Sequence, residues 1–316
     1  MDKWRGQVPA LLRYGILRMS MTLGSLPPLT RSRIPTAPAA TAQWVWTDLI
    51  AQTPWTSTHR AHPANAASAN QFAIKHVRAD LKGDNERELA CGLLQREAEV
   101  SFDVGHAHLA ATLKVLQQDD DVWLLQPYFV ASPLIAATAK GCLPAKLWLA
   151  RQIAAALAAL HANGWLHGNI TPEAIVVADG QHATLGDLGW SRRSASDECD
   201  LAGASFAGSV RYAAPEMFDN VGRLTPAADI HSLGVVVLEM LTGNTYLNAY
   251  AGAELVAVKR LVGPSISANT SLPFGVASVL NAMLSRDPLR RPTSQAVVSQ
   301  LIAHEIETFD RYGRDV

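Results

Sequence analysis

The chain has 316 residues, of which 48% are hydrophobic and 17% are charged, with a formal net charge of −1. This composition excludes a disordered protein, and the near-zero charge offers no electrostatic basis for nucleic acid as a partner. The three cysteines lie far apart and form no C-x-x-C pair, so we expect no disulfide framework, no zinc site and a reducing, cytoplasmic location.

Residues 1–43 are predicted to form an extension that precedes the folded domain. They include six basic residues and one acidic residue, and Pro, Ser and Thr are frequent from Ser25 to Thr41. A targeting segment or a membrane-surface helix is one interpretation, because apolar residues such as Leu11 and Ile16 are mixed with the arginines. We favour a disordered extension, because arginines interrupt every apolar run. No uninterrupted apolar run in the chain reaches the roughly 18 residues of a transmembrane segment.

Strand patterns dominate from about residue 44 to residue 130. An apolar strand at 71–77 carries one lysine, Lys75. A later hairpin has its predicted tip at 119–121 and its returning strand at 122–130. A helix is predicted between these strands, at 85–103.

Helical patterns dominate the rest of the chain. The helices predicted from Pro144 to Asn163 and from Asp229 to Thr242 are apolar on most faces, which is typical of buried helices. Strands followed by helices indicate an α+β protein with a small β-rich N-lobe at about 44–130 and a larger, mainly helical C-lobe at about 131–306. A tail at 307–316 follows. A cleft between the lobes is the default ligand site.

The segment Trp165–Val177 reads Trp-Leu-His-Gly-Asn-Ile-Thr-Pro-Glu-Ala-Ile-Val-Val. It resembles the catalytic loop of the eukaryotic-type (serine/threonine) protein kinase family, whose pattern is H-R-D-[LI]-K-P-x-N-[IL]. Six further motifs resemble that family and occur in its order. They are Ala73-Ile74-Lys75, Arg96-Glu97-Ala98, Asp187-Leu188-Gly189, Gly208 to Glu216, Asp229 to Gly234 and Arg286 to Thr293. The resemblance covers about residues 44–306 and implies the bilobal protein-kinase fold.

The resemblance also implies a nucleotide site. Lys75 would hold the α- and β-phosphates of ATP and pair with Glu97, and Asp187 would bind Mg²⁺. An ordinary ion pair without nucleotide remains an alternative for Lys75 with Glu97, and a turn-capping role remains one for Asp187. The remaining nucleotide-binding residues would line the hinge and the two faces of the site. These are Ala73, Gln126, Tyr128 and Val176.

Four residues are expected to support the catalytic loop without taking part in chemistry. His167 would lie beneath the turn at Asp187, and Asp229 would hold the loop from a buried helix. Glu216 and Arg291 would form a buried ion pair. All four are implied by the resemblance.

Four positions of the catalytic loop depart from the family pattern. Asn169 stands at the position of the catalytic base, and an amide cannot be ionised to accept a proton. Thr171 offers no positive charge to the γ-phosphoryl group, Ala174 cannot coordinate a second Mg²⁺, and Gly168 replaces an arginine. The glycine-rich phosphate loop is missing as well, because no glycine occurs between residues 24 and 83.

We therefore predict a pseudokinase, meaning a binding, allosteric or scaffolding module with weak or no binding of ATP and Mg²⁺. Its partner would be an unidentified protein, and we expect neither zinc nor haem. The alternative is an active, divergent serine/threonine protein kinase in which another acid, such as Glu173, replaces the missing base. A scaffold whose cleft binds nothing is the third hypothesis.

Overall fold

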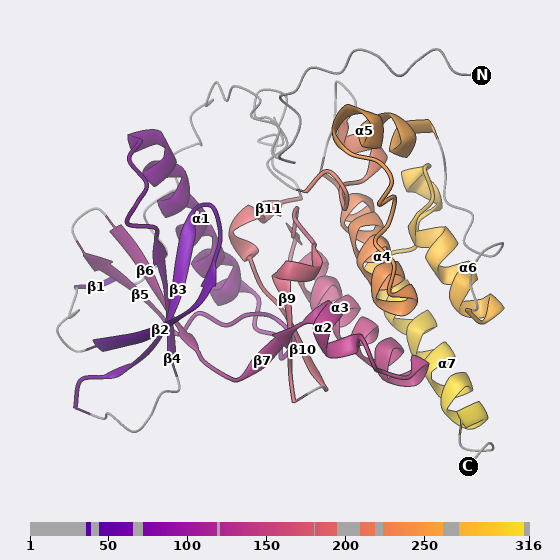
Figure 1. Cartoon of the computed structure of the whole chain (residues 1–316), viewed down its shortest axis with the longest axis horizontal. Coiled ribbons are helices and arrows are strands. Elements are labelled where there is room, and N and C mark those ends of the chain that lie inside the picture. The colour runs from indigo at the N-terminus through magenta and orange to yellow at the C-terminus, as the bar shows by residue number, and fades with distance from the viewer. Residues whose placement is uncertain are drawn as a thin grey trace.

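The computed structural model describes residues 36–38, 44–65, 72–118, 121–179, 181–194, 209–218, 224–261 and 272–312. Most of the predicted extension, the hairpin tip at 119–120 and the last four residues of the predicted tail lie outside these ranges. The chain forms a β-rich N-terminal lobe and a mainly helical C-terminal lobe (Figure 1). The predicted α+β class with two lobes is therefore confirmed.

A six-stranded sheet forms most of the N-lobe. Its strands are β1 (Thr36–Pro38), β2 (Trp44–Gln52), β3 (Thr56–Pro63), β4 (Phe72–Val77), β5 (Lys114–Gln118) and β6 (Asp121–Pro127). They lie in the order β1-β5-β6-β4-β3-β2, and every neighbouring pair is antiparallel except β1 with β5. The prediction of a disordered extension is wrong for residues 36–38, because their backbone pairs with the open edge of β5.

The two faces of this sheet are covered differently. One face packs against α1 (Asp84–Asp103), where Leu94 and Ala98 are buried together with Val77 and Leu124 of the sheet. On the other face, aromatic side chains surround a small core of Ala61, Ile74 and Leu125. They are Trp44, Trp46, Phe72 and Trp123. Because side chains alternate along β4, Lys75 lies on the same face as Val77, toward α1.

The C-lobe contains six helices among the residues described. They are α2 (Leu134–Thr138), α3 (Leu143–Ala162), α4 (Pro226–Thr242), α5 (Gly252–Leu261), α6 (Phe274–Met283) and α7 (Ser294–Tyr312). Its short strands are β7 (Ala131–Pro133), β8 (Trp165–Leu166), β9 (Ile175–Ala178), β10 (His182–Leu185) and β11 (Arg192–Arg193). Single 3₁₀ turns are η2 (Pro172–Ala174), η3 (Leu188–Trp190), η4 (Pro215–Phe218) and η5 (Pro288–Arg290). The predicted tail at 307–316 begins inside α7, whose Thr308 is buried.

The two helices that the sequence predicts as buried form the centre of the C-lobe. In α3, Ile153 and Leu157 are fully buried, and α4 contributes Leu233 and Val236 to the same core. The side chain of Thr225 caps α4 by accepting a hydrogen bond from its first turn. Among the described helices, α3 alone is long and apolar enough to cross a membrane, and its place in this core accounts for that composition.

Candidate functional site

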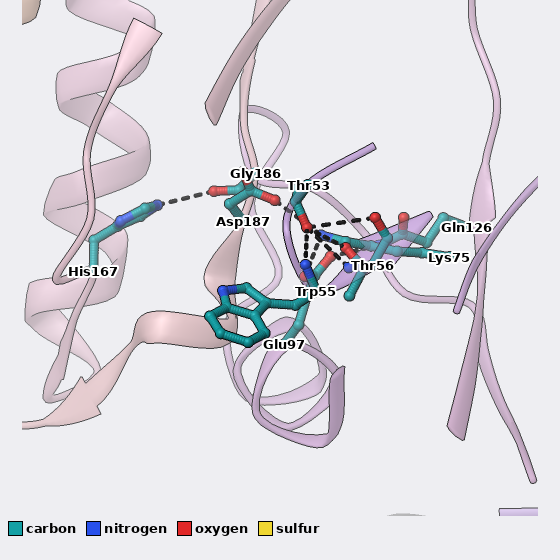
Figure 2. A network of polar contacts seen from close by, with 9 residues as sticks. All are labelled: Thr53, Trp55, Thr56, Lys75, Glu97, Gln126, His167, Gly186 and Asp187. Atoms are coloured by element: carbon teal, nitrogen blue, oxygen red, sulfur yellow. Dashed lines mark hydrogen bonds and ion pairs between the residues drawn. The ribbon is translucent and has the colours of Figure 1, made fainter. Parts of the chain in front are cut away.

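Strand β4 and helix α1 bring Lys75 and Glu97 into contact. The Nζ of Lys75 lies 2.7 Å from Oε2 of Glu97 and 2.9 Å from Oδ1 of Asp187, which follows β10 in the other lobe. Lys75 and Glu97 are only 8% and 3% exposed. The three residues predicted to share a nucleotide site therefore form one ionic cluster at the junction of the lobes, with Lys75 and Glu97 buried and Asp187 partly exposed (Figure 2).

Gln126 belongs to the same cluster. Its Nε2 donates a hydrogen bond of 2.9 Å to Oε1 of Glu97, so both oxygens of that carboxylate have a donor. Gln126 was predicted to bind nucleotide at the hinge, and its contact with Glu97 was not predicted. Its cross-strand position opposite Ala73 places the amide within reach of α1.

The ammonium of Lys75 lies between two carboxylates, and this arrangement shifts the pKa values of Lys75 and Asp187. Burial alone would lower the pKa of Lys75, but the carboxylates of Asp187 and Glu97 outweigh it and raise that pKa above its usual value. The ammonium of Lys75 lowers the pKa of Asp187, which favours its ionised form. The buried lysine is therefore held as a cation between two carboxylates, at neutral pH and without any ligand.

Asp187 could hold one metal ion. Its Oδ1 accepts from Lys75, and no described residue donates to its Oδ2. Mg²⁺ is commonly bound by one or two carboxylates together with substrate phosphates. Ala174 brings no donor atom to the site, and no cluster of three or more potential ligands occurs among the described residues. The side chains present thus fit a single carboxylate contact to Mg²⁺ and not a site for two ions.

The turn that carries Asp187 has a tight geometry. Asp187 adopts the left-handed conformation, with φ of 55° and ψ of 42°. A Cβ at Gly189 would lie 2.6 Å from the carbonyl oxygen of Leu93 in α1, so only glycine permits this close approach. The Asp187-Leu188-Gly189 motif therefore anchors the carboxylate against the helix that carries Glu97.

The hairpin between β2 and β3 lies where the resemblance places a phosphate-binding loop. The Oγ1 of Thr53 accepts hydrogen bonds from the backbone N–H groups of Trp55 (3.2 Å) and Thr56 (2.9 Å). The N–H of Thr53 donates to the carbonyl of Thr56 at 2.9 Å. Pro54 has no N–H to offer. The donors that could cradle a phosphate are thus used within the turn itself.

The same hairpin is tied to its surroundings. The carbonyl of Trp55 accepts from the N–H of Arg78, and the guanidinium of Arg78 donates to the carbonyl of Thr53 at 3.2 Å. The side chain of Trp55 packs against the apolar cluster between the sheet and α1. These contacts oppose any rearrangement that would turn the hairpin backbone toward a ligand.

The catalytic-loop positions lie in a well-defined backbone. Asn169 donates its backbone N–H to Nδ1 of His167 at 3.3 Å, and its side chain has no hydrogen-bond partner among the described residues. Thr171 and Ala174 are 7% and 5% exposed. Gly168 has a φ of +79°, and a Cβ there would lie 2.9 Å from the carbonyl oxygen of Trp190. An arginine at Gly168 would therefore be strained.

Asp229 holds this loop from below. Its carboxylate accepts from the backbone N–H groups of His167 (2.8 Å) and Gly168 (2.9 Å), and it pairs with Nε2 of His161 at 3.0 Å. Burial would raise the pKa of Asp229, but the hydrogen bond and charge of His161 lower it. His167 in turn lies 2.9 Å from the carbonyl of Gly186, next to Asp187. Asp229 and His167 were predicted from the resemblance, whereas the contact of His161 with Asp229 was not.

A second buried support joins Glu216 and Arg291. Two nitrogens of the guanidinium donate to the two carboxylate oxygens at 2.6 Å and 2.8 Å. The Arg291 side chain is fully buried, and its remaining donors reach the carbonyls of Ser285 and Ala227. The predicted ion pair is present.

The other predicted nucleotide residues lie at the strands and the linker between the lobes. Ala73 is buried in β4, and Tyr128 directly follows β6 in the linker. Val176 lies in β9 of the C-lobe, opposite Thr184 and Pro133. The alternative base, Glu173, is exposed on η2. That Ala73, Tyr128, Val176 and Gln126 contact a nucleotide stays a prediction.

The chain is similar to known protein kinases over most of its length. The sequence profile of the protein kinase domain matches residues 61–305. The serine/threonine-protein kinase PrkC of Bacillus subtilis is 29% identical over 227 residues, covering 70% of this chain and 34% of that protein. The serine/threonine-protein kinase PknK of Mycobacterium bovis is 28% identical over 235 residues, covering 72% of this chain and 20% of that protein. The serine/threonine-protein kinase PAK mbt of Drosophila melanogaster is 26% identical over 243 residues, covering 75% of this chain and 36% of that protein. The match thus spans about a third or less of each relative.

Proposed function

Because the chain belongs to the protein kinase family and has its bilobal fold, we propose that it is a pseudokinase that acts through binding. One observation carries this proposal: the catalytic loop keeps its supporting contacts and lacks its chemical groups. Asp229 and His167 hold the loop backbone in place, yet the side chain at the base position is the amide of Asn169. The proposed loss of activity is therefore chemical and does not depend on a misplaced loop.

The proposed loss in the rate of phosphoryl transfer can be bounded from the groups that are missing. A positioned general base contributes roughly a hundredfold to ten-thousandfold to a rate. Thr171 and Ala174 remove two further, independent contributions, the positive charge near the γ-phosphoryl group and the second metal ligand. Protein kinases turn over about 1–100 times per second, so loss of the base alone would leave about 10⁻⁴ to 1 turnover per second, and the two further losses lower this rate again.

The proposed nucleotide interaction is weak. Lys75 and Asp187 are the groups available for phosphates and one Mg²⁺ ion, but they are already bonded to each other at 2.9 Å. Any phosphate has to compete with the two carboxylates for the ammonium. The hairpin donors at Thr53, Trp55 and Thr56 are engaged within the turn. Ala73, Gln126, Tyr128 and Val176 are proposed to complete the site.

An active, divergent serine/threonine kinase is the second candidate, and one observation favours it. The contact of Lys75 with Glu97 and the inward position of Asp187 are features that active kinases require. In this case an acidic side chain at another position takes the place of Asn169 and receives the proton of the acceptor hydroxyl. The exposed Glu173, in the same loop, is the nearest candidate in sequence.

Phosphate incorporation from [γ-³²P]ATP separates the two candidates. The wild-type chain is compared with Lys75→Ala, with Glu173→Gln and with the triple variant Asn169→Asp, Thr171→Lys, Ala174→Asn, using a generic basic protein as acceptor. No wild-type incorporation above the Lys75→Ala background supports the pseudokinase. Wild-type incorporation that Lys75→Ala abolishes would refute it, and a further loss in Glu173→Gln would identify the base.

A second measurement tests nucleotide binding. Thermal unfolding is followed with millimolar ATP, with and without Mg²⁺. A small stabilisation that depends on Lys75 supports a nucleotide-responsive binding module, whereas no stabilisation favours a scaffold without a ligand. The protein partner, a cytoplasmic location and the domain limits at 44–306 stay predictions.

A further inference from the structure

Arg60 lies on the face of the sheet that carries the functional lysine. In the pairing of β3 with β4, Arg60 is opposite Ala73 and Thr58 is opposite Lys75. Directly opposed residues share a face, and residues two apart along a strand share it as well. Arg60 therefore belongs to the same face as Lys75, whose ammonium meets Glu97 and Asp187.

The Arg60 side chain reaches across the sheet to the linker between the lobes. Its guanidinium carbon lies 4.7 Å from the centre of the Tyr128 ring, and its Nη2 donates a hydrogen bond of 2.8 Å to the Tyr128 hydroxyl. In the sheet, β4 lies between β3 and β6, so about two strand spacings, roughly 10 Å, separate Arg60 from the linker. The side chain has to run over Ala73, which is 5% exposed.

Two further observations show that the Arg60 guanidinium has no other strong attachment among the described residues. Asp48 of β2 lies 3.6 Å from its Nη1, but Asp48 is mostly exposed and such pairs contribute little. The Nε of Arg60 is buried and has no hydrogen-bond partner among the described residues. The contact with Tyr128 is therefore the main attachment of the side chain, and Nε is shielded from water without compensation.

We propose that the bridge between Arg60 and Tyr128 occupies the base position of the nucleotide site, so that Arg60 decides which ligands this site accepts. This inference rests on the proposed nucleotide site, in which Ala73 and Tyr128 flank the base. An adenine ring at that position has to displace the guanidinium from Tyr128, which costs the hydrogen bond and the cation–π contact. Pro127, next to Tyr128, has no backbone N–H, so it cannot offer the adenine ring a hydrogen bond in place of these contacts.

The test measures binding of adenosine, which has no phosphate and so reports on the base position alone. Isothermal titration of the full chain with adenosine, without metal, compares wild type with Arg60→Val and with Tyr128→Phe, which keeps the ring and removes the hydroxyl that accepts from Arg60. Valine removes the guanidinium and retains a good strand former. Arg60→Val should bind adenosine at least about tenfold more tightly than wild type, because it removes the group that the base must displace. Tyr128→Phe should gain less, because it loses the hydrogen bond of the bridge and keeps the cation–π contact.

Asp48→Asn is the matched control, because it changes a neighbour of Arg60 and leaves the bridge with Tyr128 in place. Its adenosine affinity should equal that of wild type. A folded Arg60→Val protein without any gain in adenosine affinity over wild type overturns the inference. If Arg60→Val does not fold, judged by its thermal unfolding transition, an affinity of Tyr128→Phe equal to that of wild type overturns it.

The outcome is independent of catalysis. Wild-type phosphoryl transfer from ATP would refute the pseudokinase, while adenosine affinities that do not respond to Arg60 would refute the bridge. A gain of adenosine binding in Arg60→Val without any phosphoryl transfer supports both.

Discussion

Replacement of Lys75 by methionine tests how the ionic cluster contributes to stability. Methionine keeps an unbranched side chain of similar length and removes the ammonium. Two carboxylates then remain at the lobe junction, Glu97 at 3% exposure and the more accessible Asp187. Among the described residues, Gln126 alone still donates a hydrogen bond to Glu97. We expect Lys75→Met to lower the free energy of unfolding substantially.

The size of this loss in unfolding free energy follows from how deeply Glu97 and Asp187 are buried. Removing one partner of a buried ion pair typically costs about 3–5 kcal/mol, because the other charge is left uncompensated. The side chain of Asp187 is 32% exposed, so water screens part of its charge. The expected loss is therefore near the lower end of that range, about 3 kcal/mol.

Urea unfolding at pH 7, followed by circular dichroism, measures this loss. The double variant Lys75→Met, Glu97→Leu is the control, because it removes both members of the closest pair and should recover part of the loss. A loss of less than about 1 kcal/mol in Lys75→Met contradicts this expectation, as does a loss in the double variant equal to the sum of the losses in Lys75→Met and Glu97→Leu.

The pH dependence gives an independent check on the same cluster. Lys75 lowers the pKa of Asp187 in the folded protein. The unfolded pKa of an aspartate is about 3.9, so this contribution is fully present above that value and is lost as the pH falls through the lower, folded pKa. The acid-induced fall in unfolding free energy should be smaller in Lys75→Met than in wild type when both are measured from pH 7 to about pH 3.

Three further predictions concern other supports of the fold. Arg291→Leu should lower the unfolding free energy by about 3 kcal/mol or more, because it leaves a carboxylate without its bidentate partner, and urea unfolding measures this. Thr53→Val should cost about 1–2 kcal/mol and speed hydrogen exchange at the backbone N–H of Trp55, which loses its acceptor. Burial lowers the pKa of Lys259 to about 7, so the unfolding free energy of wild type should rise from pH 7 toward pH 10. The reason is that the unfolded chain still binds the proton there, and Lys259→Met should flatten this rise.

Much of the site could be predicted because it depends on short motifs with a fixed order. Lys75, Glu97 and Asp187 come from three separate segments, and the structure brings them within hydrogen-bonding distance as the resemblance implies. The supports Asp229 and Arg291 were predicted in the same way. Each of these contacts involves a residue whose position in its motif determines which way it points.

The contacts that the sequence did not reveal are made by long or flexible side chains. Arg60 and Tyr128 are 68 positions apart, and their contact requires both the register of β3 on β4 and a particular path of the arginine over Ala73. The amide of Gln126 meets Glu97 only because β6 lies next to β4. Periodicity predicts which face of a strand a residue occupies, but not which distant partner its side chain reaches.

The residue that holds the catalytic loop and the residue at the base position differ in how much they matter for folding. Asp229 is 1% exposed and accepts two backbone hydrogen bonds, so a replacement without two acceptor oxygens leaves at least one buried donor unsatisfied and destabilises the lobe. The side chain of Asn169 has no hydrogen-bond partner among the described residues and is partly exposed, so its identity hardly affects folding. The fold therefore depends on the residues that position the loop and tolerates change in the residue that would carry out the reaction. A chain of this kind can lose phosphoryl transfer and still present two lobes whose junction a ligand or a partner can influence.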